Sequence, residues 1–151
     1  MFAARQYELG DGAVGTSALA IADAKTQLGF GQAVALGALC NALVCLAVWL
    51  CYGARSVTDK VLAIVFPISA FVALGFEHSV ANMYFLPMGV LVRDHASDAF
   101  WADTGAAPAD FPDVTLANAL LDNLVPVTIG NVIGGSVMVG LVYWAVYLRA
   151  T

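Results

Sequence analysis

The stretch GFEHSVANM, residues 75–83, decides how this chain folds. It places Glu77 and His78 side by side in the middle of an otherwise uncharged run from 61 to 92. As one straight helix, about 32 residues would measure roughly 48 Å, which exceeds a bilayer hydrocarbon core of roughly 30 Å. Ionisable groups at the centre of a membrane are rare and usually mark an ion or proton path. We therefore predict a membrane-embedded site for a small ion, built on an interrupted helix.

The composition indicates a membrane protein. The chain is 61% hydrophobic and 11% charged, with a mean hydropathy of +0.83, well above the balance of soluble domains. The first 24 residues do not fit a cleavable signal peptide, because they hold acidic residues and no basic start followed by a short apolar core. Nothing in the net charge of −5 points to nucleic acid.

Three nearly charge-free stretches each exceed the roughly 18 apolar residues that a spanning helix needs. The predicted fold is therefore an all-α membrane protein with three transmembrane spans, the second of them broken. In chain order we expect a connector at 1–27, a span at 28–54, a loop at 55–60, a broken span at 61–92 with a pore loop at 75–81, an acidic loop at 93–123, and a span at 124–149.

Charged and aromatic residues near the span ends predict the orientation. Arg55, Lys60 and Arg149 lie on one side, against Lys25 and Arg93 on the other. Because cytoplasmic loops carry the excess of positive charge, the 55–60 loop and the C-terminus are predicted to be cytoplasmic. The same ends carry the residues of an interfacial aromatic belt, namely Trp49, Tyr52, Tyr143, Trp144 and Tyr147. The Asp-rich loop at 93–123 would lie outside, irregular with short helical turns.

His78 is the residue that we expect to meet the ion. Its imidazole titrates near neutrality and can donate a proton. A helix interrupted at mid-membrane exposes half-helix ends, and the N-terminal end attracts anions. The alternative is a histidine that bonds a neighbouring helix for structure. A haem or metal ligand is disfavoured because no second histidine lies in a predicted span, and no cofactor or metal is expected.

Glu77 needs a partner, because an unpaired carboxylate inside a membrane would be costly or would take up a proton. The candidates are Lys25, at the mouth of the first span, and Asn131, near the start of the third. We expect these three to form a supporting polar network. Asn41, a further polar group inside the first span, is counted with the pore residues.

Small residues predict close helix packing. Gly130 and Gly134 form a GxxxG pair, and Gly31, Ala35 and Ala38 line one side of the first span. In lipid such residues let helix backbones approach closely. The three cysteines all lie in the first span and are interpreted as small packing residues.

Three segments of the chain resemble the formate–nitrite transporter family and, within it, the formate channels. They are GFEHSVANM at 75–83, LCNALVCLAVW at 39–49 and PVTIGNVIGG at 126–135. The segments MGVLVRD at 88–94 and YWAVYLR at 143–149 fit the same branch. The resemblance runs from about Gly12 to the end, with the motifs in order and at the expected spacing, which makes it specific.

The resemblance implies an aquaporin-like protomer of six spans, built from two inverted three-span repeats and assembled as a homopentamer in the cell inner membrane. This chain corresponds to the last three spans, one inverted repeat, so the expected partners include a missing N-terminal half. The resemblance places the pore histidine on His78 and its neighbouring acid on Glu77. It places the basic and amide partners on Lys25 and Asn131. Apolar constrictions fall on Phe71 toward the outside and on Val44 toward the inside.

The function implied is passage of formate, or of similar small monovalent weak-acid anions, with proton coupling through the histidine and without enzymatic activity. Nitrite and hydrosulfide are the alternative substrates. A second alternative is a non-transporting membrane subunit that binds partner helices. A membrane enzyme or a quinone or haem anchor is disfavoured, because that class requires a second ligand or a redox motif and the sequence contains neither.

Overall fold

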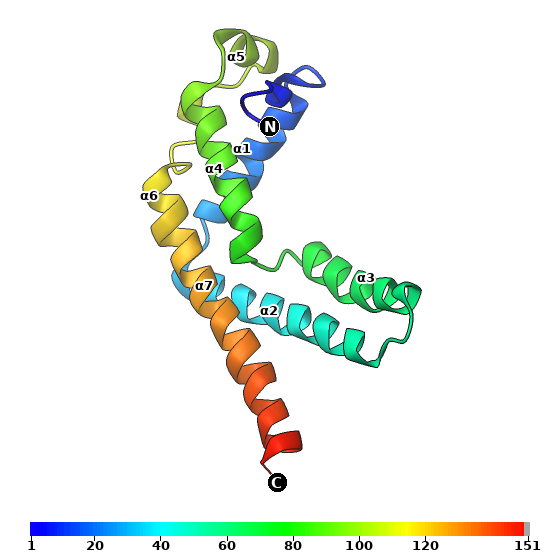
Figure 1. Cartoon of the computed structure of the whole chain (residues 1–151). Helices are drawn as coiled ribbons and strands as arrows, with labels where there is room; N and C mark the ends of the chain where they lie inside the picture. Colours follow the sequence, from blue (N-terminus) through cyan, green and yellow to red (C-terminus); the bar gives the residue numbers. More distant parts are fainter. Residues whose placement is uncertain (150–151) are drawn as a thin grey trace. The chain divides into compact units, whose positions relative to one another are not determined.

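The computed structural model describes residues 1–149, and these residues contain helices and no strand. The prediction of an all-helical chain is thus confirmed. The chain divides into two compact units. Unit 1 holds Met1–Phe30 and Val80–Val125, and unit 2 holds Gly31–Ser79 and the chain from Pro126 onward. Figure 1 labels the helices of both units.

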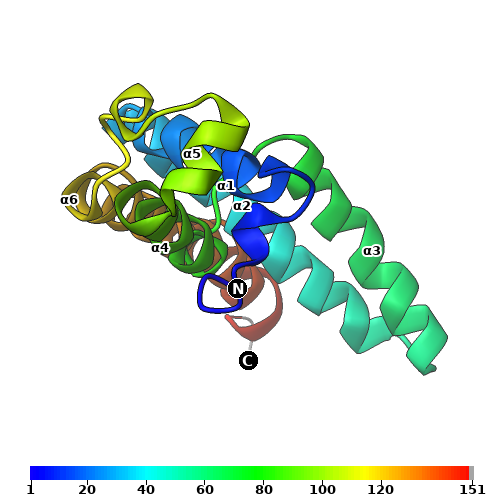
Figure 2. The same cartoon turned by 90° about the horizontal axis from the view of Figure 1, so that it is seen from above.

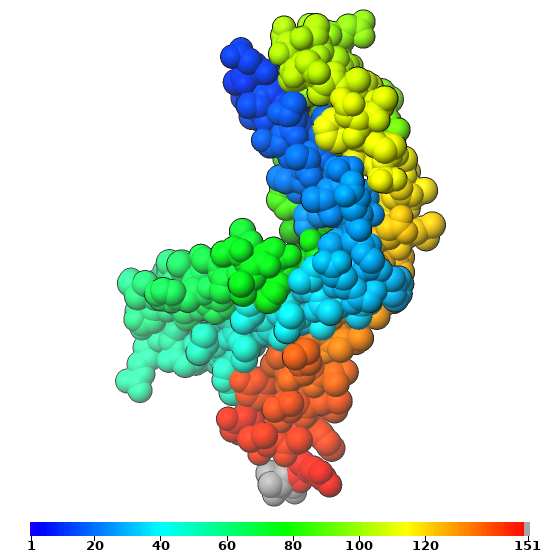
Figure 3. Space-filling model, turned by 180° about the vertical axis from the view of Figure 1, so that it is seen from behind, coloured from blue at the N-terminus to red at the C-terminus, as the bar shows by residue number. Residues whose placement is uncertain are grey.

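Unit 1 packs several short and medium helices around an apolar core. They are η1 (Gln6–Glu8), α1 (Ala13–Thr26), α4 (Ser79–His95) apart from its first residue, α5 (Asp98–Thr104), η2 (Pro108–Asp110), α6 (Leu116–Asn118) and η3 (Ala119–Leu124). α1 lies against η3, as the blue and yellow segments of Figure 3 show. The buried apolar side chains form two clusters, one of Tyr7, Leu19, Met88, Val92 and Phe100 and one of Ala22, Leu86, Val114 and Ala119.

Glycines allow the closest contacts of α1. A Cβ atom at Gly15 would lie 2.6 Å from the ring of Phe100 in α5. A Cβ atom at Gly89 in α4 would collide with the side chain of Ala22. α1 therefore packs against α4 and α5 at separations that a larger residue would not permit.

The loop expected at 93–123 contains short helices with identifiable caps. Ser97 begins α5, and its Oγ accepts a hydrogen bond from the Phe100 amide at 3.3 Å. Thr115 begins α6 in the same way, with its Oγ1 accepting from the Asn118 amide at 3.1 Å. The last helix therefore starts at Leu116, ahead of the uncharged stretch, because the cap and not the charge pattern sets its beginning.

Unit 2 is built on long helices. They are α2 (Phe30–Gly53) apart from its first residue, α3 (Val57–Ala73), α7 (Val125–Val132) apart from its first residue, η4 (Ile133–Leu141) and η5 (Trp144–Leu148). α2 and α3 run side by side in Figures 1 and 2. The turn between them carries a capping box, in which the Asp59 amide donates to Ser56 Oγ at 3.1 Å and the Ser56 amide donates to Asp59 Oδ2 at 3.0 Å.

Two helices are long and apolar enough to cross a membrane, judged by length and composition: Phe30–Gly53 and Leu116–Leu148. The remaining predicted span is divided into α3 and α4, of 17 residues each. No residue of α3 is buried, and the large apolar side chains of Phe66 and Val72 are 73% and 64% exposed. Apolar surface of this extent indicates contact with lipid or with further protein.

Aromatic side chains gather where α2 ends in unit 2. Trp49 stacks on Tyr143 with ring centroids 3.6 Å apart, and Tyr147 lies 5.7 Å from Trp49. The structure thus brings together three of the residues that the sequence assigned to an interfacial belt.

Candidate functional site

The helix interruption lies at 74–78, between α3 and α4. α3 ends in a Schellman motif, in which the Phe76 amide donates to Phe71 O at 3.0 Å and the Gly75 amide donates to Val72 O at 3.1 Å. Gly75 takes the left-handed conformation that this motif requires, with φ +65°. Other residues are strained there. Gly75 therefore determines where α3 stops.

Asn131, on α7, holds the other end of the interruption. Its Oδ1 accepts from the Ser79 amide at 3.0 Å and from Ser79 Oγ at 2.9 Å. Its Nδ2 donates to Gly37 O at 2.9 Å and to Glu77 O at 3.0 Å. An amide side chain offers two donors and two acceptor positions, so every position is used. The side chain is 7% exposed, and its hydrogen bonds offset the cost of burying it.

Asn131 reaches these groups because α2 and α7 approach closely. A Cβ atom at Gly37 would lie 2.7 Å from Val127 O. Cβ atoms at Gly130 and Gly134 would collide with carbonyl groups of α2. The GxxxG pair singled out in the sequence thus lies at the helix crossing that supports the interruption.

The residues of α2 that lie at this crossing are only in part those expected from the sequence. Asn41 Nδ2 donates to Asn131 O at 2.6 Å, so this side chain links α2 to α7. Its assignment to the pore stays a prediction. Gly31, expected to pack closely, has no atom of the described residues within 4 Å of the position of a Cβ. Val44, predicted for the inner constriction, is half-buried farther along α2.

Glu77 and His78 complete the interruption. Glu77 is 4% exposed, and its amide donates to Leu36 O at 3.4 Å while its carbonyl accepts from Asn131. His78 is half-buried and is the last residue before α4. Its ring stacks on Phe71, with centroids 5.9 Å apart and an interplanar angle of 27°. The histidine therefore sits beside the aromatic residue predicted for the outer constriction.

Lys25 lies in the last turn of α1, in unit 1. Its carbonyl oxygen accepts from Asn123 Nδ2 at 2.9 Å, and Asn123 Oδ1 accepts from Asn82 Nδ2 at 2.7 Å. Both asparagines are buried, at 1% exposure for Asn82 and 0% for Asn123. The sequence analysis did not identify this pair. The available signal was that Asn123 precedes Asn131 at a spacing of about two helical turns.

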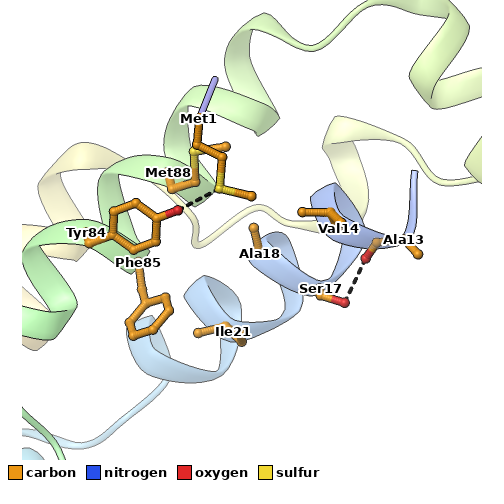
Figure 4. Close-up of a pocket in the computed structure, with 9 residues that line it drawn as sticks. All are labelled: Met1, Ala13, Val14, Ser17, Ala18, Ile21, Tyr84, Phe85 and Met88. Carbon is orange, nitrogen blue, oxygen red and sulfur yellow. Dashed lines mark hydrogen bonds between the residues drawn. The ribbon is translucent and has the colours of Figure 1, made fainter. Parts of the chain in front are cut away.

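An apolar cavity of about 430 Å³ lies in unit 1, between α1 and α4, as Figure 4 shows. Within it the Tyr84 hydroxyl donates to Met1 Sδ at 2.6 Å. Its lining includes no predicted pore residue and no charged side chain, so it does not suit a small anion. Within residues 1–149, no group of three or more His, Cys, Asp or Glu side chains is placed to hold a metal ion.

Comparison with known sequences places these observations in a family. The family model described as "Formate/nitrite transporter" matches residues 1–145. The chain is 50% identical over 149 residues to the "Formate channel FocA" of Escherichia coli (strain K12), covering 99% of this chain and 52% of that protein. It is 42% identical over 135 residues to the "Formate channel FocB" of the same strain, covering 89% and 48%. The chain spans about half the length of the curated relatives it matches.

Solved structures share the arrangement of the helices. A "Pentameric formate channel with formate bound" matches with a TM-score of 0.93 and 47% identity, over 99% of this chain and 58% of that one. An "FNT family ion channel" matches with a TM-score of 0.71 and 37% identity, over 95% of this chain and 52% of that one.

Proposed function

Since this chain belongs to the formate/nitrite transporter family, we propose that it forms part of a membrane pore that conducts formate and similar small monovalent weak-acid anions. The relatives are named as formate channels, and the structure with TM-score 0.93 is described with formate bound. The relatives are channels and transporters, which supports transport in place of enzymatic activity. The alternative of a non-transporting membrane subunit predicts that Glu77 and His78 can be replaced without loss of function.

The observation that carries this proposal is the position of His78. It lies at the end of an interruption whose two sides are held by Gly75 and by Asn131, with its ring against Phe71. An ionisable side chain on irregular backbone is tolerated in a membrane where it borders a water-filled path or is buried in protein. Because His78 is half-buried and not fully enclosed by protein, its position favours the water-filled path.

We further propose that the chain supplies one half of this pore. Its three spans, at 28–54, 61–92 and 124–149, would form one inverted repeat of an aquaporin-like six-span protomer, and five protomers would assemble. The chain covers about half of its relatives' length, which supports this assignment. The expected location is the cell inner membrane, with the C-terminus and the 55–60 loop in the cytoplasm and the acidic loop at 93–123 outside.

The mechanism follows from desolvation. A bare anion that crosses an apolar constriction loses its hydration at large cost, whereas the neutral acid does not. The charge of Lys25 and the exposed helix ends would draw the anion in. His78 would then deliver a proton, and the neutral acid would pass Phe71 or Val44. Glu77 and Asn131 would keep the histidine backbone in place.

The experiment compares two histidine variants in proteoliposomes that contain the complete pore. Formate flux is measured across pH for the wild type, for His78→Asn and for His95→Asn. His95 is exposed at the end of α4 and is the other histidine of the chain, so it provides the matched control. We expect flux through the wild type and His95→Asn to depend on pH, and flux through His78→Asn to lose that dependence. An unchanged pH profile in His78→Asn would rule out the role. Nitrite and hydrosulfide are measured in parallel to define selectivity.

A further inference from the structure

We propose that unit 2 carries a binding site for an anionic phospholipid, where the end of α2 meets the end of the last helix. Exposed aromatic rings would lie at the level of the lipid headgroups, and three cations would attract the phosphate. The residues of this lipid site are Trp49, Tyr52, Tyr143 and Tyr147 together with Arg55, Lys60 and Arg149, and all of them belong to unit 2. The inference goes beyond the proposed function, because it concerns a ligand other than the transported anion.

Trp49, near the end of α2, is at the centre of the aromatic part of the site. Its ring stacks on Tyr143 with centroids 3.6 Å apart, and its centroid lies 5.7 Å from that of Tyr147. Tyr52 lies edge-on to Trp49 at 6.3 Å. Trp49, Tyr52 and Tyr147 are all exposed, so the outer faces of these rings are open to a ligand. Tryptophan and tyrosine are enriched where the apolar and polar layers of a bilayer meet.

The cations of unit 2 are concentrated beside these rings. Among the described residues of unit 2, Arg55, Lys60 and Arg149 are the only lysine and arginines. Arg55 and Arg149 follow the aromatic residues of α2 and η5 within three positions. Lys60 lies beside the last turn of α2, because its carbonyl oxygen is 3.9 Å from Cys51 Sγ. All three side chains are exposed, and within residues 1–149 none of them forms an ion pair.

The one acidic residue near these cations does not neutralise them. Asp59 Oδ2 accepts from the amides of Arg55 at 3.3 Å and of Ser56 at 3.0 Å, so this carboxylate caps the start of α3. The other acid among the described residues of unit 2 is Glu77, beyond the opposite end of α3. Three cations against one carboxylate leave this end of the unit positively charged. Charge complementarity therefore favours a lipid with a net negative headgroup over a zwitterionic one.

The surroundings of the cations favour a lipid over a soluble anion. Large apolar side chains adjoin the rings on both helices and are each more than half exposed, namely Val48, Leu50, Val146 and Leu148. Apolar surface beside exposed cations suits acyl chains on one side and a phosphate on the other. A soluble phosphate would contact only the cations and would leave this apolar surface uncovered.

The test measures lipid binding to the assembled protein by native mass spectrometry, as dissociation constants for lipids added to detergent micelles. Dioleoylphosphatidylglycerol is the anionic probe, and dioleoylphosphatidylcholine is the zwitterionic control with the same chains. We expect the wild type to bind the anionic lipid more tightly. Lys60→Gln and Arg149→Gln should each weaken that binding about fivefold and leave the zwitterionic lipid unchanged. Tyr147→Leu should weaken both lipids about two- to tenfold.

Arg5→Gln is the matched control, because it also removes an exposed positive charge but lies in unit 1. It should bind both lipids as the wild type does. Equal affinity of the wild type for the two lipids would overturn the proposal, and so would a loss in Arg5→Gln as large as that in Lys60→Gln. Displacement of the anionic lipid by equimolar inorganic phosphate would indicate a site for a soluble anion and would also overturn it. Formate flux is not the readout, so the lipid site and the proposed function can fail independently.

Discussion

Replacing Asn131 by leucine should destabilise the protein more than any other single amide replacement on the last helix. Leucine has the same branched shape as asparagine and a somewhat larger volume, so the change creates no cavity. It removes four hydrogen bonds, to Ser79 N, Ser79 Oγ, Gly37 O and Glu77 O. Gly37 O lies inside α2 and retains its helical donor, and the hydroxyl of Ser79 can rotate. The Ser79 amide and Glu77 O then carry the main loss, at about 1–3 kcal/mol each, which gives about 2–6 kcal/mol in total.

The assay is equilibrium unfolding of the purified protein in detergent micelles, followed by tryptophan fluorescence. Asn118→Leu is the matched control, since it removes one exposed amide bond from the same helix and should cost no more than about 0.5 kcal/mol. Formate flux should fall in parallel for Asn131→Leu, because the interruption that carries His78 loses its support. A free energy of unfolding for Asn131→Leu within about 0.5 kcal/mol of the control would refute the reasoning.

Three further predictions concern the helix crossing, the helix stop and the N-terminal segment. Gly134→Ala should destabilise the protein by about 1–3 kcal/mol, because its Cβ atom would collide with a carbonyl of α2. The control Gly31→Ala, whose Cβ atom has open space around it, should be neutral or stabilising by less than about 1 kcal/mol. Equal effects of the two variants in the micelle unfolding assay would argue against the close crossing. Gly75→Ala should destabilise the protein by about 1 kcal/mol, because alanine is strained at the left-handed φ of this position. Its melting temperature should therefore fall, and a melting temperature equal to that of the wild type would contradict the left-handed conformation of residue 75. The Arg5 guanidinium, hydrogen-bonded to Glu8 at 2.6 Å, holds the pKa of that carboxyl below its ordinary 4.5, so this contribution to stability is present above pH 4.5 and is lost as pH falls through the folded pKa. Thermal unfolding of Glu8→Gln should therefore differ from wild type at neutral pH and converge with it in acid, and a constant difference would contradict the linkage.

The interruption of the second predicted span could be located from the sequence because several local signals coincide there. Gly75 provides the left-handed residue, and Glu77 and His78 make a continuous lipid-facing helix unfavourable. The structure separates α3 from α4 at 74–78, which shares residues 75–78 with the loop expected at 75–81. A helix stop of this kind depends on residues that are neighbours in the chain, so it can be predicted directly from the sequence.

The hydrogen-bond partners of the amide side chains were harder to predict from the sequence. Asn131 was expected to support Glu77, but its four hydrogen bonds depend on how α2 and α7 cross. A GxxxG pair indicates that two helices cross closely, but it does not indicate which face of the partner helix lies at the crossing. This is why Gly37 lies at the contact and Gly31 does not. The Asn82–Asn123 pair joins residues 41 positions apart on different helices. The helical spacing between Asn123 and Asn131 points to Asn123 but does not identify Asn82 as its partner.

The beginning of the last helix shows a limit of charge counting. The uncharged stretch starts at 124, but the helix begins at Leu116 and includes Asp122 on an exposed face. A capped first turn tolerates acidic residues, because they lie near the positive end of the helix dipole. Hydropathy therefore locates the apolar part of a helix better than its cap.

The most direct measurement of the central claim is the accessibility of position 78 to water and to substrate. With the three native cysteines replaced by alanine, His78→Cys is treated with a membrane-impermeant thiol reagent in the assembled protein, with formate or sulfate present. The account predicts that the thiol is modified and that formate, but not sulfate, slows its modification. A thiol that is not modified, or that is modified at a rate unaffected by formate, would contradict the claim that this residue borders the anion path.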